Sequence, residues 1–449
     1  MAVPVTDGRL PRAERLSAGK ALRDRIPRSS HADWKPGRRD PIAILRQDDR
    51  GRLKELLPIR YGRMHASPLA FLRGAASVMA ADLAPTPVTG LRVQACGDAH
   101  LLNFGGFDTP ERRLVFDITD FDETLAAPWE WDVKRLAASV AVAGRYLKHP
   151  DRDCAAAARS TVAAYRETMG RLARMTPLDV WYARLDLETV RDPAGHPVLA
   201  RHGHAGRDHP AAKVFPKTAV DGEGRTRIVD EPKKIYHSHT GVEAEAEAFL
   251  ALFRASLYPE RQVLCDRFHR VDVAMKVVGV GSVGTRCAVA LLLDDDGDPL
   301  FLQIKEARHS VLAPFAGESP YANQGERVVQ GQRLMQSASD VFLGWSRDGK
   351  GSDYYCRQLR DGKVSVSVEG MSSPELTAYA GFCGRALARA HARSGDAARI
   401  AGYLGGNDRF DQAVGAFALA YADQTERDHA ELVKAVKAGR VRADLDEAR

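Results

Sequence analysis

Apolar residues in the first half of the chain recur with spacings that change between helical and extended periods. Over residues 58–84 they return every three or four positions, which predicts a helical stretch that ends before Pro85. Short apolar runs at Leu91–Ala95 and around Leu114–Ile118 predict two strands, separated by the loop CGDAHLLNFGGF. Helical spacing returns over residues 129–147 and 153–175, so most of this half is predicted to be helical.

In the second half a helical period gives way to strands and then returns. Residues 241–257 have the spacing of a helix, and the run VDVAMKVVGVGSVGTRCAVALLLDDDGDPLFLQIKEA after them has the spacing of strands. A glycine loop and the turn DDDGD divide this run into three strands. Beyond Glu326 the chain is predicted to be mostly helical, with β-like stretches at residues 353–359 and 364–368.

Composition narrows the class of protein. The 449 residues are 44% hydrophobic and 28% charged, which is typical of a globular protein with a sizeable core. The formal net charge of +6, from 65 basic and 59 acidic residues, is spread too thinly to indicate nucleic-acid binding. The six cysteines are scattered, the N-terminal stretch is charged, and no apolar run approaches the roughly 20 residues of a membrane span. These features favour a cytoplasmic protein without membrane association.

The loop CGDAHLLNFGGF and the later ITDFDE carry the first group of reactive side chains. Asp98 and Asn103 lie five positions apart in one loop, and Asp120 follows the next strand. Phosphoryl transfer needs a carboxylate near the acceptor hydroxyl and oxygen ligands for Mg²⁺, which usually takes only one or two of them from protein. We therefore expect Asp98 to orient or deprotonate an acceptor, and Asn103 and Asp120 to bind the metal.

Asp and Asn also cap turns that have no such chemistry, and the spacing of Asp98 and Asn103 alone does not exclude that interpretation. Gly97 before the loop, His100 within it and the Asp-Phe-Asp beyond it favour the functional interpretation. For Asp117 and Asp122 both interpretations stay open, since either residue could join the metal site or merely finish a turn.

A glycine loop and a lysine form the second group. Gly279, Gly281 and Gly284 fit the pattern G-x-G-x-x-G, and the apolar run after them is typical of a strand. A dinucleotide-binding fold needs these glycines to open a helix, whereas strand, glycine loop and strand is the arrangement with which kinases cover nucleotide phosphates. We expect the three glycines and Ser282 to bind the nucleotide. Lys305, which faces inward by strand alternation, is expected to hold the α- and β-phosphates.

In kinases a glutamate on a helix holds this lysine in place. Glu326, which opens the run GERVVQGQRLMQ, is the nearest candidate, with Glu306 and Glu318 behind it. The alternative is that Lys305 is an edge residue of its strand that keeps its charge in solvent.

These motifs resemble those of known enzymes. CGDAHLLNFG and ITDFDE are similar to the H-G-D-x-H-x-x-N and I-D-F motifs of aminoglycoside phosphotransferases and related kinase-like enzymes. In that superfamily an Asp after the metal-binding Asp supports the catalytic loop, and Asp132 in PWEWDVKRLA occupies this place. CGRALARAHARSGD resembles the L-A-x-L-H helix of the same enzymes. Over residues 40–430 the chain also resembles the bacterial family called domain of unknown function 2252.

The resemblance implies an α+β, protein-kinase-like fold of two lobes, apparently circularly permuted. In ordinary kinases the glycine loop and the lysine precede the catalytic Asp, whereas here Asp98 and Asp120 come first. Permutation is physically possible because cuts in exposed loops are tolerated. The expected segments are a loosely ordered arm (1–40), the catalytic and metal loops of the helical lobe (41–190), a polar excursion (191–240), a β-rich nucleotide-binding lobe (241–370) and C-terminal helices packed on the helical lobe (371–449).

The motifs together predict an ATP- and Mg²⁺-dependent phosphotransferase that acts on a hydroxyl of a small-molecule acceptor. Asp98 and Lys305 would be its catalytic residues. Two alternatives stay open on the same fold: transfer of a nucleotidyl (AMP) group, and a pseudokinase that binds nucleotide without chemistry. The acceptor and the oligomeric state do not follow from the sequence.

Overall fold

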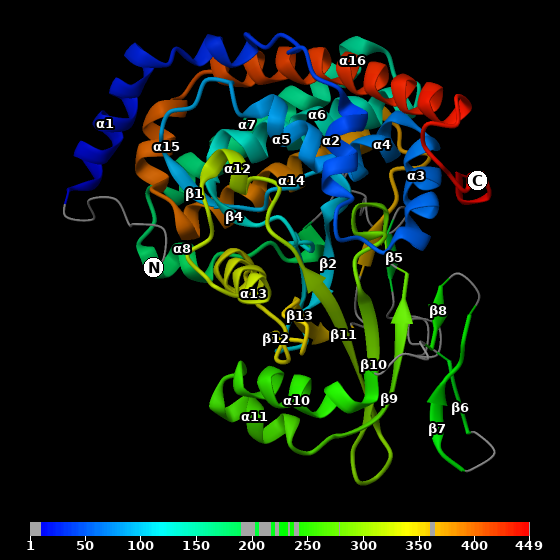
Figure 1. Cartoon of the computed structure of the whole chain (residues 1–449). Coiled ribbons are helices and arrows are strands. Elements are labelled where there is room, and N and C mark those ends of the chain that lie inside the picture. Colours follow the sequence, from blue (N-terminus) through cyan, green and yellow to red (C-terminus); the bar gives the residue numbers. More distant parts are fainter. Residues whose placement is uncertain are drawn as a thin grey trace.

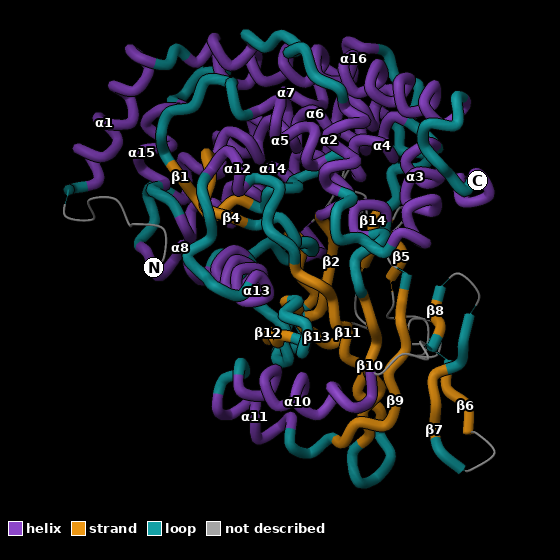
Figure 2. The backbone as a smooth tube through the Cα atoms, in the orientation of Figure 1, coloured by secondary structure: helices purple, strands orange, loops and turns teal. Residues whose placement is uncertain are grey.

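The computed structural model describes residues 10–189, 203–205, 217–220, 224–231, 234–237, 242–277, 279–359 and 364–448. Helices gather in one part of the molecule and the long strands in the other (Figures 1 and 2). The chain is therefore a mixed α+β protein with open sheets, as the apolar spacing predicts. Most of the polar excursion expected at residues 191–240 lies outside the described residues.

Four long helices, two from the first half of the chain and two from its C-terminal part, form the centre of the helical part. α6 (Trp129–Tyr146) and α7 (Asp151–Leu172) pack against α14 (Ser373–Ser394) and α16 (Arg409–Lys437). The Trp129 ring stacks on Tyr165, with centroids 5.7 Å apart. The shorter helices of this part are α2 (Pro41–Asp48), α8 (Pro177–Tyr182), α12 (Ala313–Ala316) and α15 (Ala397–Leu404). In the described residues no helix is both long and apolar enough to cross a bilayer.

The N-terminal segment is more ordered than its polar composition suggests. Residues 12–25 of the expected loose arm form helix α1 (Arg12–Arg25), which packs along α15. Arg23 Nε donates a hydrogen bond to Tyr403 O at 2.8 Å, and the backbones approach so closely that a Cβ on Gly19 would lie 2.0 Å from Arg399 O. The expectation of a loose arm is wrong for this stretch because the partner helix lies at the other end of the chain.

The helical stretch predicted over residues 58–84 is divided into three helices. They are α3 (Leu57–His65), α4 (Pro68–Gly74) and α5 (Ala76–Leu83). Ser67 accepts a hydrogen bond from Ala70 N and Pro68 occupies the first turn, which are strong signals for a new helix. The apolar spacing continues across this break because all three helices face the same core.

The strand part is dominated by one antiparallel sheet with the order β12-β13-β11-β10-β9-β8 in the described residues. Its centre is the predicted succession of strand, glycine loop and strand. The bounds are β8 (Ile235–Tyr236), β9 (His269–Lys276), β10 (Cys287–Leu293), β11 (Pro299–Ala307), β12 (Gly344–Arg347) and β13 (Asp353–Gln358). Lys305 on β11 is paired with Cys287 on one side and Tyr355 on the other.

Helices cover this sheet, and a small hairpin lies beside it. α10 (Val242–Ala255), α11 (Pro259–Cys265) and α13 (Gln324–Met335) are the helices of this part. Phe253 of α10 belongs to the same buried cluster as Leu302 of β11. The strands β6 (Thr218–Val220) and β7 (Thr226–Ile228) pair with each other as the hairpin.

Two small sheets lie between the parts and carry the loops of interest. β1 (Arg92–Ala95) pairs with β4 (Leu125–Pro128), and the other sheet has the order β3-β2-β14-β5. Its strands are β2 (Phe104–Asp108), β3 (Leu114–Ile118), β5 (Gly203–Ala205) and β14 (Val364–Val366). Sequence reasoning missed β2 because glycines weaken strand patterns. A Cβ on Gly105 would lie 2.6 Å from Val364 O, so only glycine lets β14 approach.

Candidate active site

A cavity of about 900 Å³ lies where the two parts of the chain meet. It is lined from the helical part by α3, α4, α5 and the loops after β1 and β3, and from the strand part by the glycine loop and β11. Most residues singled out from the sequence line it: Asp98, Asn103, Asp120, Asp122, Gly279, Gly281, Ser282 and Lys305. Tertiary structure therefore joins the two motif groups, which are more than a hundred residues apart in the chain.

The Asp98 loop is anchored to the first turn of α6. Asp132 accepts hydrogen bonds from Cys96 N at 2.6 Å and from Gly97 N at 2.9 Å, and His391 Nε2 lies 3.1 Å from the same carboxylate. Gly97 has φ +83°, and a Cβ there would lie 2.3 Å from Glu123 O. The structure thus gives Asp132 the loop-supporting position that the resemblance implies.

Asp98 is paired with a cation and is half-buried in the lining of the cavity. Its Oδ1 accepts a hydrogen bond from Arg135 Nε at 2.6 Å, and Arg135 is itself held by Leu72 O at 3.0 Å. Burial raises the pKa of Asp98 above its ordinary value, although the charge of Arg135 opposes the shift. A positioned carboxylate with a raised pKa is suited to accept a proton near neutral pH.

Lys305 meets the acidic turn that follows β3. Its Nζ forms an ion pair with Asp122 and lies 3.8 Å from Asp120 Oδ2. Asp122 also accepts hydrogen bonds from Tyr355 OH at 2.8 Å and from Ser282 Oγ at 3.0 Å. The alternative that Lys305 keeps its charge in solvent is wrong, because the residue is only 4% exposed.

The expected glutamate partner of this lysine is also wrong. Glu326 lies in the first turn of α13 but does not line the cavity, Glu306 pairs with Arg286, and Glu318 lies beside His309. Asp122, in the turn after β3, forms the ion pair with Lys305 that a helical glutamate was expected to form. The sequence signal for this ion-pair partner was the second Asp of the DFD motif, which is Asp122.

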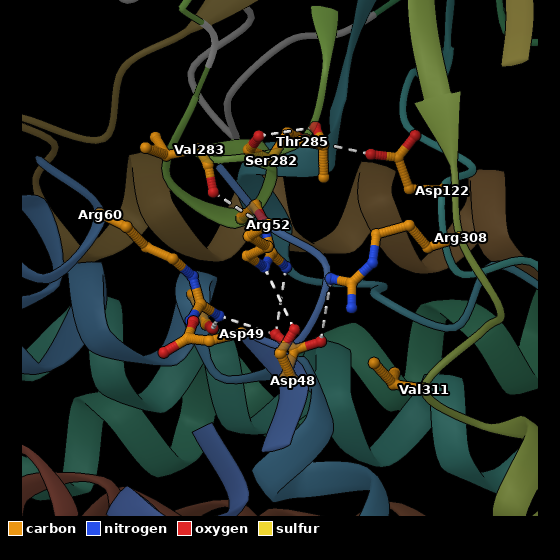
Figure 3. Close-up of polar contacts among 12 residues, drawn as sticks. Asp48, Asp49, Arg52, Arg60, Asp122, Ser282, Val283, Thr285, Arg308 and Val311 are labelled. Atoms are coloured by element: carbon orange, nitrogen blue, oxygen red, sulfur yellow. Dashed lines mark hydrogen bonds and ion pairs between the residues drawn. The ribbon is translucent and has the colours of Figure 1, made fainter. Parts of the chain in front are cut away.

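The glycine loop is held from below by the segment after α2, as Figure 3 shows. Arg52 Nη1 donates to Gly281 O at 3.0 Å and to Val283 O at 2.8 Å, and Leu53 N donates to Gly284 O at 2.7 Å. Gly284 has φ +88°, a conformation that favours glycine. Gly284 does not line the cavity, so its role is in the shape of the loop.

Asp48 orients the arginines beneath this loop (Figure 3). Its carboxylate lies 3.1 Å from Arg52 Nη2 and 2.9 Å from Arg60 Nη2, and Arg308 Nη1 lies 3.6 Å away. Sequence reasoning missed these residues. An arginine in a polar stretch gives no local signal that it will reach a loop 229 positions further along the chain.

The oxygen donors around Asp120 fit a Mg²⁺ ion. Burial raises the pKa of Asp120, and the neighbouring charge of Asp122 raises it further. The charges of Lys305 and Arg357 oppose this shift, and Asp120 offers carboxylate oxygens of the kind that a divalent cation takes as ligands. Asn103 Nδ2 donates to Asp98 O at 2.8 Å, which leaves the amide oxygen available. Within the described ranges, no group of three or more His, Cys, Asp or Glu forms a metal centre by itself.

Asp117, the other undecided carboxylate, has a structural role. It is fully buried and accepts hydrogen bonds from Arg389 Nη2 at 2.6 Å and from Ser337 N at 2.9 Å. It does not line the cavity. Asp117 therefore links β3 to α14 and is not part of the candidate metal site.

Comparison with known proteins identifies a family and no activity. A family model described as an uncharacterized protein conserved in bacteria (DUF2252) matches residues 52–435. This range contains all of the cavity residues except Asp48. No match was found among curated proteins or among solved structures.

Proposed function

The chain belongs to the family of uncharacterized bacterial proteins DUF2252, and we propose that it is an ATP- and Mg²⁺-dependent phosphotransferase with a small-molecule acceptor. One observation carries the proposal. Lys305 from the strand part lies against Asp120 and Asp122 in a cavity that also contains Asp98 and the glycine loop. A cationic clamp, backbone amides and oxygen donors at one place are what phosphoryl transfer requires.

The nucleotide phosphates would lie between the glycine loop and Lys305. Gly279 and Gly281 line the cavity without side chains, which allows a phosphate to approach the backbone closely. Lys305 is already fixed by Asp122, so little side-chain entropy is lost when a phosphate binds. The volume of about 900 Å³ is sufficient for a nucleotide and part of an acceptor.

Asn103 and Asp120 would hold Mg²⁺, which would neutralise charge that develops on the transferred group. Asp98 would accept the proton of the acceptor hydroxyl, with Arg135 keeping its carboxylate in place. The backbone bonds from Cys96 N and Gly97 N to Asp132 hold this loop in a single position. Precise placement of the acceptor oxygen accounts for much of the rate enhancement in such reactions.

A circularly permuted, protein-kinase-like fold is part of the same proposal. From β9 onward the chain runs through the glycine loop, Lys305, α13, β13 and then α14, which is the order of a kinase up to its catalytic loop. The catalytic loop itself comes from the first half of the chain. In support of this order, His391 of α14 lies 3.1 Å from Asp132, the residue that anchors the Asp98 loop.

The test is Mg²⁺-dependent ATP turnover with a panel of hydroxylated small molecules. Asp120→Ala should reduce kcat/KM at least about 100-fold, the size expected when one stabilising charge is removed from such a site. Asp295→Asn, in the exposed turn between β10 and β11, is the matched control and should have wild-type turnover.

Undiminished turnover in Asp120→Ala would refute the assignment. The mass of the modified acceptor separates phosphoryl from nucleotidyl transfer. ATP binding without turnover across the whole panel would favour the pseudokinase instead.

A further inference from the structure

Besides Arg60, whose Nη atoms are already paired with Asp48 and Asp49, three residues that line the cavity have a buried polar atom without a hydrogen-bond partner among the described residues. These atoms are Arg73 Nε, Ser77 Oγ and His100 Nδ1. All three residues line the cavity, and they come from α4, α5 and the Asp98 loop. Buried polar groups in proteins are nearly always paired, and leaving one unpaired costs about 1–3 kcal/mol. Other buried atoms of the described residues are also unpaired, but these three belong to residues that line one cavity, where a bound ligand can supply their partners.

Arg73 is the charged residue among these three. Its side chain has no ion-pair partner in the described part of the chain. A guanidinium stays protonated in proteins, so its charge has to be compensated by something else. The backbone of the same residue borders the glycine loop, since a Cβ on Gly281 would lie 3.3 Å from Arg73 O.

The charge of Arg73 is in excess at this end of the cavity. Asp98, the carboxylate whose charge acts on Arg73, is already paired with Arg135. Burial and the charge of Arg63, on α3, lower the pKa of Arg73. His100 Nε2 lies 3.9 Å from Asp98 Oδ2, beyond hydrogen-bond distance, so the ring can carry its proton on the unpaired Nδ1, where an anion would accept it.

We propose that Arg73, Ser77 and His100 bind an anionic group, a carboxylate or a phosphate, on the acceptor. This inference rests on the proposed function, because it assigns the end of the cavity beside Asp98 to the acceptor. A guanidinium binds carboxylates and phosphates through paired, charge-assisted hydrogen bonds, and the hydroxyl and the ring N–H supply further donors.

Position favours the acceptor over the nucleotide as the source of the anion. The phosphates of the nucleotide have Lys305 and the glycine loop, and the charge of Lys305 acts mainly on Asp120 and Asp122. Arg73 acts on Asp98 and His100 instead. The positive charge of Arg73 also opposes a cationic group at this position, so the resemblance to aminoglycoside phosphotransferases should not extend to their substrates.

Anion binding is the first test and uses inorganic phosphate on the full-length protein at constant ionic strength. Wild type should show saturable thermal stabilisation by phosphate, and Arg73→Ala should weaken the apparent affinity at least about tenfold. Arg270→Ala on β9 is the matched control, since Arg270 Nε is also buried without a partner but the residue does not line the cavity. Equal affinity in wild type and Arg73→Ala, or no phosphate binding, would overturn the proposal.

The second test locates the anion with a non-hydrolysable ATP analogue and Mg²⁺. If the anion belongs to the acceptor, phosphate and the analogue bind together, and Arg73→Ala binds the analogue as tightly as wild type does. If Arg73 instead contacts the γ-phosphate, the variant loses affinity for the analogue but not for ADP, and the acceptor assignment is wrong.

The same measurements separate this inference from the proposed function. Phosphate binding that depends on Arg73, in a protein that binds no nucleotide, would reject the phosphotransferase and keep the anion site. Nucleotide binding and turnover without phosphate binding would reject the anion site and keep the phosphotransferase. In the acceptor panel, turnover is expected with hydroxylated carboxylates or phosphates and absent with aminoglycosides.

Discussion

Individual carboxylates in this protein differ in how their charge is compensated, and the differences follow from their neighbours. Asp98 and Asp117 each meet an arginine. Glu130, at the start of α6, meets no arginine among the described residues and is held by Thr89 N and Thr89 Oγ at 2.7 and 2.6 Å, with the charge of Lys134 nearby. Burial raises the pKa of Glu130 from 4.5 to about 7, although these hydrogen bonds oppose the shift.

This shift predicts a pH dependence of stability. The pKa of Glu130 is higher in the folded protein than in the unfolded chain. Its contribution to the free energy of unfolding is therefore fully present below about pH 4.5 and is lost as the pH rises through about 7. Glu130→Gln keeps an acceptor for Thr89 and removes the titration. The loss of unfolding free energy between pH 5 and pH 8 should therefore be smaller in the variant, by at most about 3 kcal/mol.

Urea unfolding of both proteins at the two pH values measures this difference. Glu14→Gln, an exposed change on α1, should reproduce the wild-type dependence. An identical pH dependence in wild type and Glu130→Gln would show that the Glu130 carboxyl is charged when folded.

At the scale of elements, the glycine loop depends on a segment that lies outside its own sheet. Arg52 donates to two carbonyls of the loop, and Leu53 N donates to a third. Ser282 adds a contact to Asp122 on the opposite side. The loop is therefore held in place before any ligand binds. Its rigidity depends on the contact between residues 52–53 and the loop that joins β9 to β10.

Arg52→Ala should loosen this loop without unfolding the protein. Two lost hydrogen bonds, each worth about 0.5–1.5 kcal/mol, should speed amide exchange of Ser282 and Thr285 by roughly 10- to 100-fold. Asp48 keeps Arg60 and Arg308 as partners, so the rest of the network persists.

Hydrogen exchange followed by mass spectrometry measures the effect on the peptide that contains the loop. Arg50→Ala changes an exposed side chain in the same turn and serves as the control. If exchange in the loop were the same in both variants, Arg52 would not be what holds it.

At the scale of the whole molecule, the two ends of the chain close over the helical part. Arg39 donates to Asp82 of α5 through two nitrogens and to Asp428 of α16 through two, at distances of 2.6 to 2.8 Å. Both carboxylates are buried, and Tyr421 OH donates to Asp82 as well. One side chain thus joins the N-terminal segment, an early helix and the last long helix.

Arg39→Ala should be strongly destabilising because it leaves two buried carboxylates without their cation. The expected loss is about 3–5 kcal/mol of unfolding free energy. Arg38→Ala, at the adjacent exposed position, should change it by less than about 0.5 kcal/mol. Chemical denaturation of the two variants measures both values, and equal stabilities would show that Arg39 contributes little to closure.

Much of the fold and of the candidate site could be predicted from local pattern. The strands on both sides of the glycine loop, the long helices α6 and α7, and the cavity positions of Asp98, Asn103, Asp120 and Lys305 agree with expectation. The helix breaks near Ser67, the strand β2 and the order of residues 12–25 did not follow from apolar spacing. Each depends on a partner elsewhere in the chain.

The sequence by itself determined which residues have the chemistry and which local element carries them. Periodicity, turn residues and motif spacing act over a few positions, so they can be read along the chain. Tertiary structure alone decided that Asp122 meets Lys305, that Arg52 supports the glycine loop, and that Arg73 Nε has no hydrogen-bond partner among the described residues. Ion pairing and burial depend on which distant segments pack together, and no local pattern contains that information.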